Sequence, residues 1–374
     1  MAKMRVDKIA KPTATGTDFG RTTFPRLGEQ GMERSKVMEK RNNFSCAGKA
    51  IALVIGMSAL AGASAAEAKT VRFTTQLPQH NFAAQNVQMF ADCVSGKTDL
   101  EFQIYPSAQL YRDKEVPQAV SSGAIEMGMV TSARFAGTIP AMEIFDVPFA
   151  TGMRGDLVKM IAPGEKVRVL LDDAVAATGS RVVWWIDYGR TVFISKKDHP
   201  IRLPADLKNL KVRVLGRTYG EFVEVNGGAP TLTSGSEQFL AYQRGTVNAG
   251  MTGVASVKSR KLYEVMDVTT FTEHAHIEFL SLINEKFWNG LTDNERATMT
   301  SCGQEAEKAN RENVTKIEQE AIDFLKSKGG EIITLNEEEL ATWRASGKPV
   351  VESYLKHSGE LGKKVYEAAQ SYLK

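Results

Sequence analysis

The stretch KVRVLGRTYG, residues 211–220, carries the alternation of side chains that decides the fold class. Read with a period of two, Val212 and Val214 lie on one face of a short strand, and Lys211 and Arg213 lie on the other. An apolar face opposite a charged one is typical of a half-buried strand, so the alternation alone assigns Arg213 to solvent.

Short apolar runs of this kind recur along the chain, and stretches with the period of an amphipathic helix separate them. The expected strands are 69–76, 100–105, 125–130, 181–187, 191–195, 210–214 and 278–284. The expected helices are 83–94, 115–122, 236–243, 293–328 and 337–373. Strands that alternate with helices at this spacing favour an α/β architecture.

The length and composition are those of a globular protein. The chain has 374 residues, of which 43% are hydrophobic and 24% are charged. These values exclude the disordered and fibrous classes and allow about two domains.

A segment near the start of the chain has the pattern of an export signal. Residues 38–68 join a basic start, an apolar core shorter than the about 18 residues of a membrane anchor, and a small-residue pattern that predicts cleavage after Ala68. Residues 1–37 are expected to be a leader that is untranslated or unstructured. From residue 69 onward, 36 Lys and Arg face 38 Asp and Glu. This balance gives no argument for nucleic acid or an anionic membrane as a partner.

Few residues in the sequence indicate redox chemistry, metal binding or catalysis. Cys93 and Cys302 are the cysteines beyond the signal, and a chain of this length needs no cross-link, so we expect two free thiols, with a disulfide as the alternative. His274 and His276 share a strand face with Glu278, where hydrogen-bonded histidines are expected instead of a metal site. No nucleophile with a base and an orienting group is recognisable, so neither catalysis nor a cofactor is expected.

Six blocks follow one another in a familiar order over about 300 residues. They are YPSAQLYRDKEVPQAVSSGAIEMGMVTSARF (105–135), FDVPF (145–149), LPADLKNLKVRV (203–214), PTLTSGSEQFLAYQRGTVNAG (230–250), KLYEVMD (261–267) and LINEKFW (282–288). This series resembles the substrate-binding proteins of tripartite ATP-independent periplasmic (TRAP) transporters. Six ordered blocks are more specific than any single short motif.

The resemblance implies a two-lobed α/β fold of the periplasmic-binding-protein type, with hinge strands and a long helix that spans both lobes. The helical run after Asp293 suits that helix. Lobe I would hold residues 69–187 and 278–317, and lobe II would hold residues 188–277 and 318–374. The ligand would lie in the cleft between the lobes, which would close by a hinge motion.

The resemblance also implies ligand contacts. Arg213 matches the family arginine that pairs with the carboxylate of an organic acid, because a planar guanidinium offers two parallel donors to two carboxylate oxygens. Arg190 matches a second family arginine that assists it, and Arg217 is expected to be a surface charge. Other expected contacts are Gln76, Phe149, Thr131, Ser132, Trp184, Tyr188 and Thr252, with Asn81 in the same loop as Gln76 and Arg134 in the same block as Thr131.

The clearest departure from the family pattern lies at 247–253. Met251 and Thr252 stand where many members carry an acidic or polar residue and an amide, which favours a ligand with a less polar tail.

The sequence therefore predicts a periplasmic, monomeric solute-binding protein that is not an enzyme. It would capture a small organic acid and deliver it to two membrane subunits for uptake driven by an ion gradient. The alternatives are the binding protein of an ATP-driven importer or of a sensory receptor, and an exported enzyme. No metal, cofactor or nucleic acid is expected.

Overall fold

The computed structural model describes residues 69–373. The expected leader at 1–37, the signal peptide at 38–68 and the cleavage after Ala68 lie outside these residues. Within 69–373, no helix combines the length and the apolar character needed to cross a membrane.

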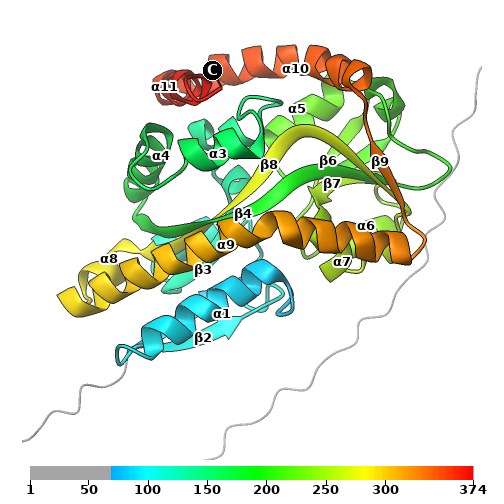
Figure 1. The fold of residues 1–374 in the computed structure, drawn as a ribbon. Coiled ribbons are helices and arrows are strands. Elements are labelled where there is room, and N and C mark those ends of the chain that lie inside the picture. Colours follow the sequence, from blue (N-terminus) through cyan, green and yellow to red (C-terminus); the bar gives the residue numbers. More distant parts are fainter. Residues whose placement is uncertain (1–68, 374) are drawn as a thin grey trace, which may run out of the picture. The chain divides into compact units, whose positions relative to one another are not determined.

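Nine strands form one mixed sheet in the order β2-β1-β3-β8-β4-β7-β5-β6, and β9 pairs with β8 beside this path. The strands at each end pair in parallel, whereas β4 and β8 are antiparallel to each other and to their outer neighbours. The strands are β1 (Thr70–Thr74), β2 (Glu101–Tyr105), β3 (Met127–Thr131), β4 (Ser180–Ser195), β5 (Lys211–Val214), β6 (Ala229–Leu232), β7 (Ala249–Gly253), β8 (Val268–Asn284) and β9 (Glu331–Thr334) (Figure 1).

The two halves of this sheet define the two lobes. Lobe I contains β2, β1 and β3, and lobe II contains β7, β5 and β6, while the long strands β4 and β8 run through both. The helices are α1 (Phe82–Ser95), α2 (Val116–Ser121), α3 (Arg154–Met160), α4 (Lys166–Ala176), α5 (Arg217–Val225), α6 (Gln238–Gln243), α7 (Val254–Ser259), α8 (Glu285–Asn289), α9 (Asp293–Ser327), α10 (Glu337–His357) and α11 (Gly359–Gln370). Short 3-10 turns are η1 (Ser132–Phe135), η2 (Pro140–Phe145), η3 (Pro204–Leu207) and η4 (Leu262–Glu264). The two-lobed α/β prediction is confirmed.

The expected strands 181–187 and 191–195 form one continuous strand, β4. Its register against β8 shifts between Asp187 and Arg190, and Gly189 at this point has φ of 88°. This left-handed conformation suits glycine, and a Cβ here would also lie 2.5 Å from Oε1 of Glu318. The irregular segment therefore lies where β4 passes from one lobe to the other.

Helix α9 runs beside this irregular segment and packs against α1, β4 and α7 (Figure 1). Its 35 residues begin at a capping box of Thr292 and Glu295. Three of its side chains accept hydrogen bonds from β4 backbone N–H groups: Glu307 from Trp185 at 3.1 Å, Asn310 from Asp187 at 2.8 Å and Glu318 from Arg190 at 2.8 Å. The helix thus supplies acceptors where the pairing of β4 is irregular.

The C-terminal helices pack across both lobes. Helix α10 contacts α5 and η2, and α11 contacts η2 and α4 (Figure 1). Both η2 and α4 belong to residues that the sequence-based division placed in lobe I, and the assignment of residues 318–374 to lobe II stays a prediction.

The expectation of two free cysteines is wrong. Cys93 of α1 and Cys302 of α9 form a disulfide, with their Cα atoms 5.9 Å apart. The two helices lie side by side, so the fold brings together residues that are 209 positions apart in the sequence. Chain length gave no information about this contact.

Removing the disulfide is expected to destabilise the protein. The double variant Cys93→Ser/Cys302→Ser should lose about 2–4 kcal/mol of unfolding free energy, because the unfolded chain is released from a long closed loop. Urea denaturation with and without a thiol reductant measures this. The reduced unaltered protein should match the double variant, and a midpoint of the unaltered protein that does not respond to reductant would contradict the prediction.

Candidate functional site

Arg213 occupies β5 in the middle of lobe II, and its side chain is buried, with 2% exposed. Its Nε and Nη2 donate to the carbonyl of Thr233 at 3.1 and 2.8 Å, and Nη1 donates to the carbonyl of Met251 at 2.7 Å. These bonds use three of the five N–H groups and fix the plane of the guanidinium. One N–H on each terminal nitrogen remains, which is the pair that can bind two carboxylate oxygens.

No carboxylate of the described residues pairs with Arg213, and two further arginines lie near it. Burial lowers the pKa of Arg213 to about 10, and the charges of Arg134 and Arg260 contribute to this lowering. Arg134 is paired with the buried Asp113 at 2.6 Å. Three guanidinium groups with one partner carboxylate leave an excess of positive charge in a region of low dielectric, which favours the binding of an anion.

The cavity in front of Arg213 is small, and both polar and apolar side chains line it. It measures about 20 Å³, and both lobes contribute to its wall, which consists of Gln76, Leu77, Thr131, Tyr188, Arg213, Leu215, Gly235, Gln238, Thr252, Gly253, Ser256, Arg260, Ile277 and Phe279.

Several buried polar atoms in and around this cavity have no hydrogen-bond partner among the described residues. They include Thr131 Oγ1, Arg134 Nη2, Ser234 Oγ, Gln238 Oε1, Tyr242 Oη and Arg260 Nε. Buried polar groups in native proteins are almost always hydrogen-bonded, so this concentration of free donors and acceptors indicates a site for a polar ligand.

Side-chain contacts hold the two lobes together around the cavity. Arg260 Nη2 donates to the backbone carbonyl of Gln76 at 3.0 Å. At the exposed edge, Arg112 pairs with Glu237 at 3.0 Å. These contacts join lobe I to lobe II across the cavity.

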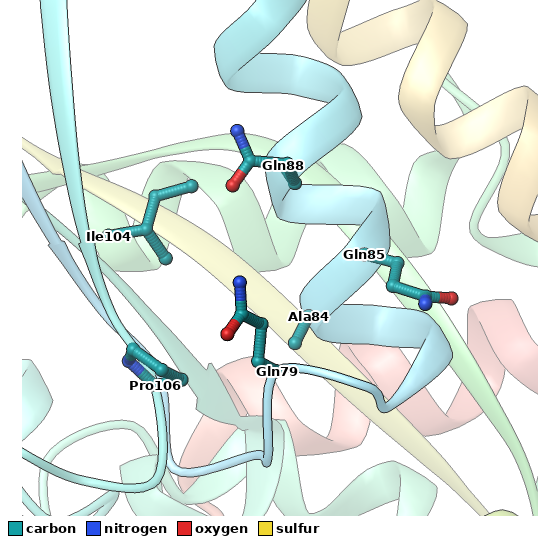
Figure 2. Close-up of a pocket in the computed structure, with 6 residues that line it drawn as sticks. All are labelled: Gln79, Ala84, Gln85, Gln88, Ile104 and Pro106. Carbon is teal, nitrogen blue, oxygen red and sulfur yellow. The ribbon is translucent and has the colours of Figure 1, made fainter.

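A larger cavity of about 240 Å³ lies between α1 and β2 in lobe I. Figure 2 shows Gln79 and Gln88 between the helix and the strand that carries Ile104, with Gln85 pointing away. Its wall has no charged side chain that could fix a carboxylate. Arg213 is buried and no carboxylate of the described residues pairs with it, so its cavity is the candidate site despite its smaller volume.

Comparison with known proteins identifies the family. The model of the bacterial extracellular solute-binding protein family 7, DctP, matches residues 73–357. The chain belongs to this family. Its relatives include the 2,3-diketo-L-gulonate-binding periplasmic protein YiaO of Escherichia coli, which is 28% identical over 75% of this chain and 85% of its own length. The sialic acid-binding periplasmic protein SiaP of Vibrio cholerae is 24% identical over 80% of this chain and 92% of its own length.

Solved structures of the family have the same fold. A TRAP periplasmic solute-binding protein from Sulfurospirillum deleyianum with bound succinate superposes with a TM-score of 0.74, at 25% identity over 80% of this chain and 98% of its own. DctP7 of Bordetella pertussis, which binds pyroglutamic acid, superposes with a TM-score of 0.76, at 22% identity over 81% of this chain and all of its own. The protein is thus a solute-binding protein of the TRAP type.

Five of the nine expected contacts in this DctP-family chain meet at one cavity. Gln76, Thr131, Tyr188 and Thr252 line it together with Arg213. Met251, which departs from the family pattern, contacts the site through its backbone. Its carbonyl accepts a hydrogen bond from Arg213, and its side chain is buried in the core.

Arg190 does not lie in the cavity wall. Its Nη1 donates to Glu273 at 2.8 Å and its Nε to Glu318 at 3.2 Å, and its guanidinium lies over the ring of Phe271 at 4.5 Å. Both carboxylates already compensate this charge. The geometry therefore gives Arg190 a role in joining β4, β8 and α9, and it does not support the expected ligand contact.

Three other expected contacts also lie outside the cavity wall. Trp184 is fully buried, donates to Asn86 at 3.0 Å and stacks on Phe90. Phe149 donates its backbone N–H to the carbonyl of His274 at 2.7 Å, and Ser132 is a buried residue of η1 next to Thr131.

The histidine pair of β8 lies in the core. His274 stacks between Phe193 and Phe222, and burial lowers its pKa to about 3. Burial also lowers the pKa of His276. Among residues 69–373, no group of three or more His, Cys, Asp or Glu side chains is placed to hold a metal ion.

Arg260 and Gln238 are the main cavity residues that sequence reasoning missed. Arg260 lies within the basic run KSRK (258–261), which is typical of a solvated surface, and Gln238 begins α6 inside one of the six family blocks. The position of Gln238 inside a family block was the one signal that could have indicated its role. No pattern in the sequence distinguished Arg260 from Lys258.

Proposed function

We propose that this protein captures a small organic acid in the cavity between its lobes and delivers it to the membrane subunits of a TRAP transporter. One observation carries the proposal: Arg213 is buried, held by two backbone carbonyls and has two N–H groups free for a carboxylate. Relatives that bind succinate or pyroglutamic acid support the ligand class.

Arg260 and Gln238 extend this site beyond the carboxylate. Arg260 Nε and Gln238 Oε1 are a donor and an acceptor without partners among the described residues, and both side chains line the cavity. They are proposed to bind a second polar group of the acid, with Thr252 and Phe279 forming the less polar wall. The hinge is proposed to lie at the irregular segment Asp187–Arg190 of β4.

Transport without chemical conversion is the proposed role of the protein. The family consists of binding proteins, and the cavity contains no side chain arranged as an activated nucleophile. Export to the periplasm and action as a monomer belong to the same proposal, which the periplasmic location of the relatives supports.

A thermal-shift screen tests the proposed ligand class. Succinate, L-pyroglutamate, D-glucuronate and galactonate are compared with the corresponding uncharged amides. An acid present at about 100 times its dissociation constant should stabilise the fold by about 2.7 kcal/mol, and its amide should not, since it lacks the charge that Arg213 requires. A screen in which no acid raises the melting temperature, or in which acid and amide act equally, would contradict the proposal.

A further inference from the structure

Asn81 begins helix α1 in lobe I and is 1% exposed. Its Oδ1 accepts a hydrogen bond from the backbone N–H of Ala83 at 3.0 Å, so the oxygen is fixed as the helix N-cap. The amide nitrogen must then point the other way. It donates to Tyr188 Oη at 2.7 Å and to Ser259 Oγ at 2.8 Å, which uses both of its N–H groups.

The three residues joined by this amide belong to three different parts of the molecule. Asn81 lies in lobe I, Tyr188 lies in β4 next to Gly189 at the irregular segment, and Ser259 ends α7 in lobe II. A neighbouring contact between His80 Nε2 and the carbonyl of Ser259, at 2.9 Å, joins the same two lobes.

Tyr188 connects this contact to the ligand cavity. Its Oη also lies 2.8 Å from Ser256 Oγ, and both Tyr188 and Ser256 line the cavity, whereas Asn81 does not. The ring of Tyr188 stacks on Phe82, the residue after Asn81, with centroids 5.0 Å apart. The start of α1 is therefore held against the cavity wall by stacking and by hydrogen bonds.

We propose that Asn81 is a positioning residue that stabilises the closed state by linking helix α1, the hinge strand and helix α7. The inference rests on the proposed function and concerns how the bound acid is retained. Contacts that exist only when the lobes are closed are the ones that shift the equilibrium toward closure. In an open arrangement the amide and Ser259 would exchange these bonds for bonds to water, so the gain belongs to the closed state.

The variant Asn81→Ser separates this role from helix capping. Serine is as good an N-cap as asparagine, but its side chain lacks the amide that reaches Tyr188 and Ser259. Ser259→Ala removes the lobe II partner without changing a residue of the cavity wall. Asn289→Ser, at an exposed asparagine of α8, is the matched control.

The experiment measures binding of whichever acid among succinate, L-pyroglutamate, D-glucuronate and galactonate gives the unaltered protein its largest thermal shift. Asn81→Ser is expected to bind this acid about tenfold more weakly, because one or two hydrogen bonds of the closed state are lost. The loss should lie in a faster dissociation rate, with the association rate and the unfolding midpoint of the ligand-free protein unchanged. The double variant Asn81→Ser/Ser259→Ala should bind the acid only slightly more weakly than Asn81→Ser does. The change Ser259→Ala should therefore reduce the affinity much less in Asn81→Ser than in the unaltered protein, since the two residues share a bond. Asn289→Ser should bind as the unaltered protein does.

The possible results separate this inference from the proposed function. If no acid of the panel shifts the melting temperature of the unaltered protein, the proposed function fails and the inference fails with it. Equal affinities of Asn81→Ser and the unaltered protein would overturn the positioning role alone. The positioning role would also be overturned if the losses of affinity in the two single variants simply added up in the double variant. The same holds if ligand-free Asn81→Ser has a lowered unfolding midpoint that accounts for the weaker binding, since a purely structural role predicts both results.

Discussion

Replacing Arg213 by alanine is expected to weaken binding of the organic acid by about 2–5 kcal/mol, which would raise the dissociation constant of a micromolar ligand to between about 30 μM and about 5 mM. The variant leaves the ligand carboxylate buried without its partner and frees the carbonyls of Thr233 and Met251, which now accept from the guanidinium. Isothermal titration with the acid selected by the thermal screen measures the change.

Two further variants make this result specific. Arg213→Lys keeps the charge but cannot donate to both carbonyls and to two carboxylate oxygens, so its affinity should lie close to that of Arg213→Ala. Arg217→Ala is the matched control, because Arg217 is half exposed and pairs with Glu221 one turn further along α5. An affinity of Arg213→Ala equal to that of the Arg217→Ala control would sink the assignment.

Arg213 also shows how far the alternation of a strand can predict an environment. The period of two correctly placed Val212 and Val214 on one face and Lys211 and Arg213 on the other. Lys211 is exposed and Arg213 is buried, because Arg213 lies nearer the carboxyl end of β5, where the other lobe covers the sheet. Which side faces solvent depends on the second lobe, and no local pattern contains that information.

The larger elements were predictable, and most misses concern contacts between distant segments. The long helix after Asp293 and the strands of lobe I follow from apolar periodicity and capping residues. The expected helix 337–373 is two helices, because Ser358 and Gly359, the latter with φ of 69°, end α10 and begin α11. The pairing of Cys93 with Cys302, in contrast, depends on how α1 packs on α9.

Contacts between distant segments also decide which charged residues belong to the site. Arg213 lies in an expected strand inside a family block, and Arg190 lies between two expected strands. Glu273 and Glu318 reach Arg190, whereas no carboxylate of the described residues reaches Arg213. Arg260 stands in a basic run, and only its contact with Gln76 across the lobes shows that it belongs to the cavity. The compensation of a charge is a property of tertiary structure.

Glu307 of α9 is a buried and compensated charge beside strand β4. Its Oε1 accepts from Arg168 at 2.9 Å and from Arg311 at 3.1 Å, and its Oε2 accepts from the backbone N–H of Trp185 at 3.1 Å. Burial alone would raise the pKa of Glu307, but the two arginines outweigh burial, and the pKa lies below its ordinary value. The folded state therefore favours the ionised carboxylate.

Glu307→Ala is expected to lower the free energy of unfolding by about 3 kcal/mol near neutral pH, because Arg168 keeps only the part-exposed Asp172 as a partner and the Trp185 N–H loses its acceptor. Glu307→Gln keeps an acceptor oxygen for the N–H but removes the charge, so its loss should be smaller. Glu312→Ala, at an exposed position of the same helix, is the control and should change stability by less than about 0.5 kcal/mol. Urea denaturation followed by circular dichroism measures all three variants.

The pH dependence distinguishes the ionic role of Glu307 from its packing. A carboxylate whose pKa is depressed by folding contributes stability above its unfolded pKa of about 4.3, and that contribution is lost as the pH falls through the folded pKa. The destabilisation by Glu307→Gln should therefore shrink as the pH is lowered into this range, since the unaltered carboxyl becomes protonated as well. A loss that stays constant with pH would show that the charge of Glu307 has no part in holding α9 to β4, and the helix would then stabilise the strand through packing and through hydrogen bonds that do not depend on this charge.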